Sequence, residues 1–180
     1  MANMYTKIPL PSLSGKLRDY PMFKRRWKQG PGVRFSQDDQ LIHIIAQVPK
    51  TVEPRLKNAQ NMTEVWKILD AEYNQPLDIV NEVVNDLVDC KINPKGSDSA
   101  QFLEFFDHYE QARNDLIEID AEAELSSLTL INKLANKLPK LIAYEYGRYR
   151  VTVQESKDSE GDKFNDFLIA ERRCQKEMSR

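Results

Sequence analysis

The fold class follows from the stretch DSAQFLEFFDHYEQARNDLI at residues 98–117. Its apolar side chains recur three or four positions apart: Phe102, Phe105, Phe106, Tyr109, Ala112 and Leu116. That spacing places them on one face of an α-helix. Asp98 and Gln101 form a capping pattern at its start. The stretch therefore predicts a long amphipathic helix whose aromatic face lies in a hydrophobic core.

The same helical periodicity runs through the rest of the chain. It predicts further helices at residues 37–47, 63–73, 77–90, 121–138 and 162–178. Shorter helices are predicted around Trp27, after Pro49 and around Tyr146. No pair of segments reads as two strands. The predicted fold class is therefore all-α.

Charge is distributed unevenly along the chain. Residues 1–76 carry 12 Lys and Arg against 7 Asp and Glu, whereas residues 77–180 carry 14 against 21. The helix-breaking sequence Asn74-Gln75-Pro76 coincides with this change. We therefore expect two small helical lobes, residues 1–76 and residues 77–180. The first begins with an extended arm of about fifteen residues, where prolines forbid a helix interior. We expect Trp66 and Leu69 to anchor its core, and Phe105 to anchor the second.

The composition excludes membrane and secreted classes. Of the 180 residues, 41% are hydrophobic and 30% are charged, which is typical of a folded globular chain. The apolar runs are too short to span a bilayer. The first residues lack the basic and then apolar pattern of a secretory signal. We expect an intracellular, cytoplasmic protein with no membrane segment.

No pattern of catalytic, metal-binding or cofactor-binding residues occurs in the sequence. Cys90 and Cys174 are far apart, as are His43 and His108, so no disulfide framework or metal cluster is expected. The sequence contains no glycine-rich phosphate loop and no Gly-x-Ser-x-Gly motif. We therefore expect no catalytic residues, no metal and no cofactor, and we do not expect an enzyme.

A basic segment with aromatic residues is the candidate nucleic-acid site. It is Phe23-Lys24-Arg25-Arg26-Trp27-Lys28, and its candidate contacts are Lys24, Arg25, Arg26 and Lys28. Lysine and arginine neutralise phosphates, and aromatic rings stack on bases. A competing interpretation places Phe23 and Trp27 in the core and the cations in water. The four-residue spacing of the two aromatics favours this second interpretation.

Several short motifs follow one another along the chain. They are LPSLSG at 10–15, DYPMF at 19–23 with Trp27, DQL at 39–41 with Val48-Pro49, EVWKILDAEY at 64–73, NKLP at 136–139 and FNDFLIAE at 164–171. Their order resembles the Gag capsid region of LTR retrotransposons, most closely that of Bel/Pao-like elements and related metazoan Gag-like proteins. The resemblance covers nearly the whole chain.

The segment at residues 95–106 occupies the place of the retroviral major homology region, which opens the C-terminal capsid domain. The residues that match are Gly96, Phe102, Phe105 and Phe106. Lys95 stands where the family has glutamine, and His108 where it has arginine. The family's glutamate has no clean equivalent. The resemblance therefore implies the aromatic packing of this region and leaves its polar network without matching residues.

The resemblance implies a capsid protein whose two helical domains are similar to the N- and C-terminal domains of retroviral capsids. Such a protein associates with itself into a shell around the element's RNA. The two-lobed division is also similar to that of Arc, a domesticated Gag protein. The sequence contains no Cys-x-x-Cys-His zinc knuckle, the usual RNA-packaging module. Two alternatives stay open: an oligomerising adaptor that binds peptides in a helical groove, and a nucleic-acid-binding module that uses the basic first half.

The resemblance further implies that the helix after the major homology region pairs the C-terminal domains about a twofold axis. We expect that helix at residues 121–138. Its core-facing stripe should consist of Leu128, Ile131, Ala135 and Leu138. Leu130 lies on the flank of this stripe, and we expect it to be the contact between two copies.

Overall fold

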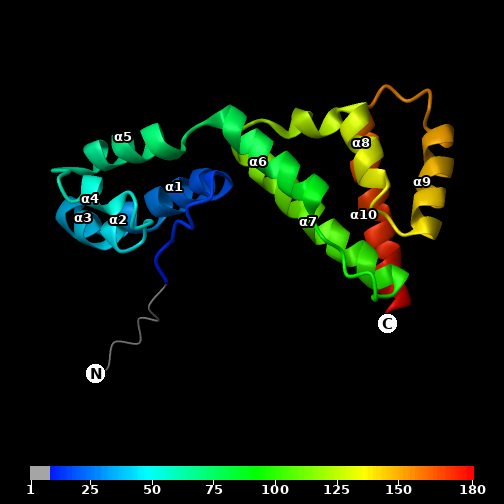
Figure 1. Ribbon diagram of the computed structural model, residues 1–180, viewed down its shortest axis with the longest axis horizontal. Coiled ribbons are helices and arrows are strands. Elements are labelled where there is room, and N and C mark those ends of the chain that lie inside the picture. The colour runs from blue at the N-terminus through cyan, green and yellow to red at the C-terminus, as the bar shows by residue number, and fades with distance from the viewer. Residues whose placement is uncertain (1–8) are drawn as a thin grey trace. The chain divides into compact units, whose positions relative to one another are not determined.

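The chain folds into helices joined by short loops, as a computed structural model that describes residues 9–180 shows (Figure 1). The first elements are the 3₁₀ turn η1 (Leu17–Asp19) and helices α1 (Tyr20–Gln29), α2 (Pro31–Arg34), α3 (Gln37–Ile45), α4 (Glu53–Leu56) and α5 (Met62–Tyr73). They are followed by α6 (Pro76–Asp89), α7 (Asp98–Glu118), the 3₁₀ turn η2 (Glu122–Ser126), α8 (Leu128–Ala135), α9 (Lys140–Thr152) and α10 (Glu160–Met178). Residues 9–180 contain no strand. The predicted all-α class is confirmed.

The chain divides into two compact units, of which the first ends at Ile79 and the second begins at Val80. This border lies three residues beyond the expected one, inside α6. Proline fits the first turn of a helix, so Pro76 starts α6 and does not separate the two units. A break in local sequence therefore marks the start of a helix here and not the border between the units.

The core of the first unit is built around Trp27, which is fully buried. Tyr20 and Phe23 from α1 and Ile44 from α3 pack in the same cluster, with further buried side chains from α4 and α5. The buried indole Nε1–H of Trp27 donates to Gln40 Oε1 at 3.3 Å, which links α1 to α3. Burial of the aromatic face of α1 is thus what holds these short helices together.

The expected N-terminal arm is described from residue 9 onward, and residues 1–8 lie outside the described part of the chain. Residues 9–14 form no helix, as their prolines require. Leu13 is nevertheless buried in the first core, and its backbone N–H donates to the Gln47 carbonyl at 2.8 Å. Residues 9–14 are thus attached to the core of the first unit through Leu13.

Two helix starts differ from the sequence prediction by the identity of the capping residue. Ser97 caps α7 and Ser159 caps α10, because each serine has an extended backbone and its hydroxyl accepts an N–H from the first turn. Asp98 and Asp162, the expected caps, lie inside the first turns, where a negative charge favours the helix dipole.

The expected long helix at residues 121–138 is interrupted. Ser127 has an extended backbone that ends η2, and its hydroxyl accepts from the Leu130 N–H as the cap of α8. The new register buries Leu130, Ile131, Leu134 and Leu138 and leaves Leu128 half-exposed. The expectation of an exposed Leu130 on the flank of this helix, and of Leu128 in its core stripe, is therefore wrong.

Aromatic rings hold three helices of the second unit together. Phe164 of α10 meets Tyr109 of α7 edge-on at 5.7 Å and Tyr146 of α9 edge-on at 5.1 Å between ring centroids. Phe167, one turn further along α10, lies 5.2 Å from Tyr146. Such tilted and edge-on arrangements are the favoured geometry for aromatic pairs. Through these contacts, α10 packs against both α7 and α9.

The two tryptophans of the first unit should differ in their contribution to stability. Trp27 is fully buried, whereas Trp66 packs on the rim of the core and is only half-buried. We expect Trp27→Ala to cost about 3–5 kcal/mol in the free energy of unfolding, and Trp66→Ala clearly less. Urea unfolding followed by circular dichroism measures both. Equal losses in the two variants would contradict this description of the core.

Candidate functional site

The basic segment lies on α1 with its aromatic residues turned inward. Phe23 and Trp27 are buried, while Arg25, Arg26 and Lys28 are exposed. The structure therefore favours the interpretation in which the aromatics belong to the core and the cations face water. Arg25 Nη1 lies 3.4 Å from Gln29 Oε1, one turn along the same helix.

Trp66 of α5 lies next to the basic segment and was not assigned to it from the sequence. The ammonium groups of Lys24 and Lys28 each lie 5.6 Å from the centroid of its ring. A cation held over an indole face is attracted by the ring's quadrupole. Both lysines therefore cover a ring that could otherwise stack on a base.

A hydrogen-bonded cluster joins α1 to α5. Lys24 Nζ pairs with Asp70 at 2.8 Å, and the Tyr20 hydroxyl donates to the same carboxylate. Burial by itself would raise the pKa of Asp70, but the hydrogen bonds from Lys24 and Tyr20 and the charges of Lys24 and Lys28 hold it below its ordinary value. Burial and the bonded carboxylate raise the pKa of Tyr20. One of the four candidate cations thus has a structural role.

The segment that resembles the major homology region packs by its aromatic residues, as the resemblance implies. Phe102 and Phe105 are fully buried, and Phe106 is almost so. A side chain at Gly96 would meet its nearest neighbour at 3.5 Å, which is an ordinary contact. The described structure therefore uses the three phenylalanines and does not require glycine at position 96.

A polar network fixes the turn before α7, through residues that the sequence analysis did not select. Gln101 Nε2 donates to the carbonyls of Gly96 at 3.0 Å and Pro94 at 3.2 Å. Glu104 Oε2 accepts from the Asn93 N–H at 3.2 Å. The turn is therefore tied to the first two turns of the helix that follows it. A glutamine and a glutamate at these spacings from Asn93-Pro94 were the available signal.

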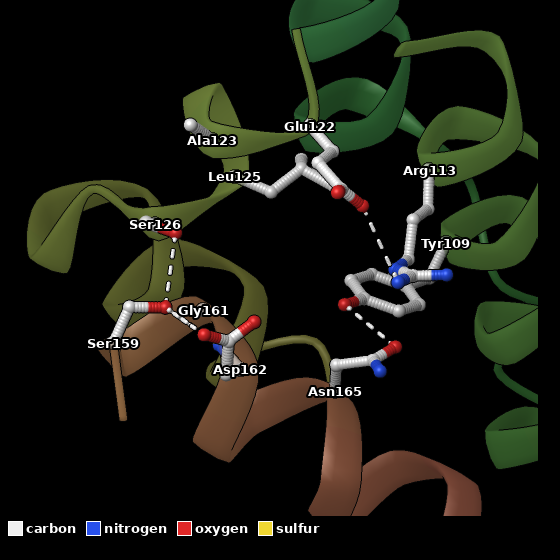
Figure 2. A pocket seen from close by; sticks show the side chains of 10 residues that line it. All are labelled: Tyr109, Arg113, Glu122, Ala123, Leu125, Ser126, Ser159, Gly161, Asp162 and Asn165. Atoms are coloured by element: carbon white, nitrogen blue, oxygen red, sulfur yellow. Dashed lines mark hydrogen bonds and ion pairs between the residues drawn. The ribbon is translucent and has the colours of Figure 1, made fainter. Parts of the chain in front are cut away.

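A cleft of about 390 Å³ lies between α7, η2 and the start of α10 (Figure 2). Its polar side chains bind one another. Arg113 pairs with Glu122 at 3.4 Å, Tyr109 donates to Asn165 at 3.2 Å, and Ser159 donates to Asp162 at 2.8 Å. Burial, the largest cause, raises the pKa of the Tyr109 phenol, so it stays a neutral donor. The cleft is built as a set of internal ties between three elements.

Gly161 is required at one wall of this cleft. A Cβ at this position would lie 2.4 Å from Ser126 Oγ and 2.9 Å from Ser126 Cα. Because the second atom is backbone, η2 and α10 would have to move apart to accommodate it. The sequence gave no sign of this close approach, since Gly161 sits in a polar stretch that reads as a loop.

The remaining candidate groups for chemistry are dispersed. His43 stacks on Phe35 with 5.2 Å between ring centroids, His108 is exposed on α7, and Cys174 is exposed on α10. Burial, the largest cause, raises the pKa of the Cys90 thiol. Among the residues that the structure describes, no group of three or more His, Cys, Asp or Glu could hold a metal ion. None of the helices searched within that same part is long and apolar enough to cross a membrane.

Comparison with known proteins gives no match to this chain, whether with protein-family models, with curated proteins or with solved structures.

The Asp70 cluster should make the stability of the first unit depend on acid pH. Because folding lowers the pKa of Asp70, its stabilising effect is complete above the pKa of the unfolded state, about 4, and is lost as the pH falls through the folded value. We expect Asp70→Asn to cost about 1 kcal/mol at pH 7, since the pair is partly exposed and screened by solvent. The gap between wild type and variant should close below pH 4.

Urea unfolding at a series of pH values measures this gap. The control variant is Glu64→Gln, which changes an exposed carboxylate on the same helix. A gap between wild type and Asp70→Asn that stays constant from pH 7 to pH 3 would show that the carboxylate does not stabilise the fold through its charge.

Proposed function

We propose that this chain is a structural protein that associates with itself, of the kind found in the Gag capsid region. The order of motifs along the chain supports this proposal. The observation that carries it is the segment at residues 95–106. Its three phenylalanines are buried at the point where the second unit's longest helix begins, as the resemblance implies. The turn before that helix is also held by side-chain hydrogen bonds, although through residues other than those the family uses.

The polar clusters of the described residues agree with a structural role. Tyr20, Lys24 and Asp70 join two helices of the first unit, and the side chains of the cleft join three elements of the second. Groups whose hydrogen bonds are made within the protein serve packing and are not free to act on a substrate. We therefore propose a scaffold and not an enzyme, and we keep the expectation of a cytoplasmic location.

RNA enters the proposal as a partner bound through its phosphates. Arg25, Arg26 and Lys28 are exposed along α1, and the first 76 residues carry a net positive charge. Trp27 is buried, and lysines cover Trp66, so the nearby rings are not presented for base stacking. Contacts of this kind give salt-dependent affinity without sequence preference.

Electron microscopy of the purified protein tests the proposal, over a range of protein and salt concentrations and with and without RNA. We expect particles or large regular assemblies. Small oligomers that never grow would favour the adaptor alternative. A monomer at every concentration, salt and RNA level would contradict the proposal.

A pair of variants separates RNA binding from assembly. Arg25→Glu with Arg26→Glu should weaken RNA binding and reduce its salt dependence by about one log unit per lost phosphate contact. Lys16→Glu with Lys50→Glu makes the same change in net charge at exposed positions elsewhere in the first unit. Fluorescence anisotropy with labelled RNA measures both, and equal losses would show that α1 is not the specific contact.

A further inference from the structure

Helix α9 is packed along one face. Ile142 and Tyr146 are buried on that face, where Tyr146 meets the rings of Phe164 and Phe167 on α10. Arg150 also faces inward, since its Nη1 donates to Asn132 of α8 at 3.1 Å and its guanidinium lies 5.4 Å from the centroid of the Tyr146 ring. Figure 1 shows α9 at the edge of the second unit, held between two loops.

The opposite face of α9 is apolar and uncovered. Leu141 and Tyr144 are each 65% exposed, and Val151 is 72% exposed. Their spacings of three and seven residues align them along one side of the helix. Single exposed apolar residues are normal at protein surfaces, but a continuous stripe on one helix indicates an interaction surface.

Gly147 lies in the middle of this helix, beside the stripe. An interior glycine costs a helix about 1 kcal/mol relative to alanine. A Cβ at Gly147 would meet nothing within 4 Å, so packing within the chain does not require glycine there. The absence of a side chain does, however, allow a second backbone to approach α9 closely at this point.

We infer that this stripe is the surface through which two copies of the chain associate, with their α9 helices antiparallel about a twofold axis. The inference deepens the proposed function and rests on it. A twofold interface requires a surface that is complementary to itself. On α9 the midpoint between Leu141 and Val151 is residue 146, and the midpoint between Tyr144 and Arg148 is the same residue.

A single axis at residue 146 therefore satisfies all pairs at once. It sets Leu141 opposite Val151 of the second copy, and the Tyr144 ring opposite Arg148 of the second copy, a cation–π pair. Glu145, whose Oε1 lies 3.8 Å from Arg148 Nη1 within one chain, falls one residue from the level of Arg148 of the second copy. The charges thus match across the axis.

The same arrangement keeps like charges at the ends of the helices apart. Lys140 of one copy lies at the level of Thr152 of the other, so the two Lys140 side chains are separated by about 18 Å along the axis. The surface expected from the family resemblance is not available instead, because Leu130 is buried in its own core. Charge and register on α9 therefore favour a second copy as its occupant.

The first test compares two aspartate substitutions at exposed apolar residues. Leu141→Asp places a carboxylate in the apolar stripe, and we expect the dissociation constant of the dimer to rise by about tenfold or more. Ile42→Asp is the matched control, since Ile42 is 69% exposed on α3 of the first unit. Sedimentation equilibrium measures association, and circular dichroism verifies that the helices are intact.

A rescue variant tests the antiparallel register. In Leu141→Asp with Val151→Lys, the new acid faces the new base of the other copy, whereas ten residues, about 15 Å, separate them within one helix. We expect this double variant to regain most of the lost association. Recovery is not expected if the stripe binds some other apolar surface.

Disulfide trapping tests the axis without relying on weakened binding. In a chain carrying Cys90→Ser and Cys174→Ser, Gly147→Cys sets the two thiols about 3 Å apart along the helix axis, whereas Thr152→Cys sets them about 18 Å apart. Under mild oxidation we expect a covalent dimer from the first and not from the second.

The outcomes separate the two claims. A wild-type chain that stays monomeric up to millimolar concentration overturns both the proposed self-association and the role of α9. If wild type associates while Leu141→Asp associates equally well, or while Gly147→Cys fails to cross-link, the role of α9 alone is overturned.

Discussion

The contact of the Phe164 ring with Tyr109 and Tyr146 is the interaction on which the second unit depends. It joins α7, α9 and α10, which are distant in sequence. By turning Tyr146 inward it also determines which face of α9 is left in water. The stripe Leu141, Tyr144 and Val151 is exposed because Ile142 and Tyr146 are buried on the opposite side. Packing within one chain and the surface offered to another chain therefore have the same cause.

Periodicity in the sequence was sufficient to predict the helical class and the buried face of α7, where apolar residues at spacings of three and four leave no other arrangement. It failed at α8. Residues 121–138 read as one helix, but the cap made by Ser127 ends η2 and starts α8, which moves Leu130 from the flank into the core. A serine within a continuous periodic pattern does not reveal whether its hydroxyl will cap a new helix, since that depends on tertiary contacts.

The candidate sites were predictable to different degrees. The inward orientation of Phe23 and Trp27 followed from their spacing, whereas the position of Trp66 beneath Lys24 and Lys28 did not, because it requires α5 to pack on α1. The roles of Gln101 and Glu104 were hidden for a similar reason. Both bind backbone groups of a turn, and such partners leave no pattern in side-chain identity. Gly161 likewise has meaning only once Ser126 is placed against it.

The central claim is that this helical scaffold associates through the outer face of α9. Hydrogen–deuterium exchange at low and high protein concentration tests it most directly, because the backbone amides of each helix report separately and no substitution is needed. We predict that exchange over residues 140–152 slows as the protein associates, while exchange over residues 37–45 of α3 stays the same. An increase in mass with no added protection over residues 140–152 would contradict the account.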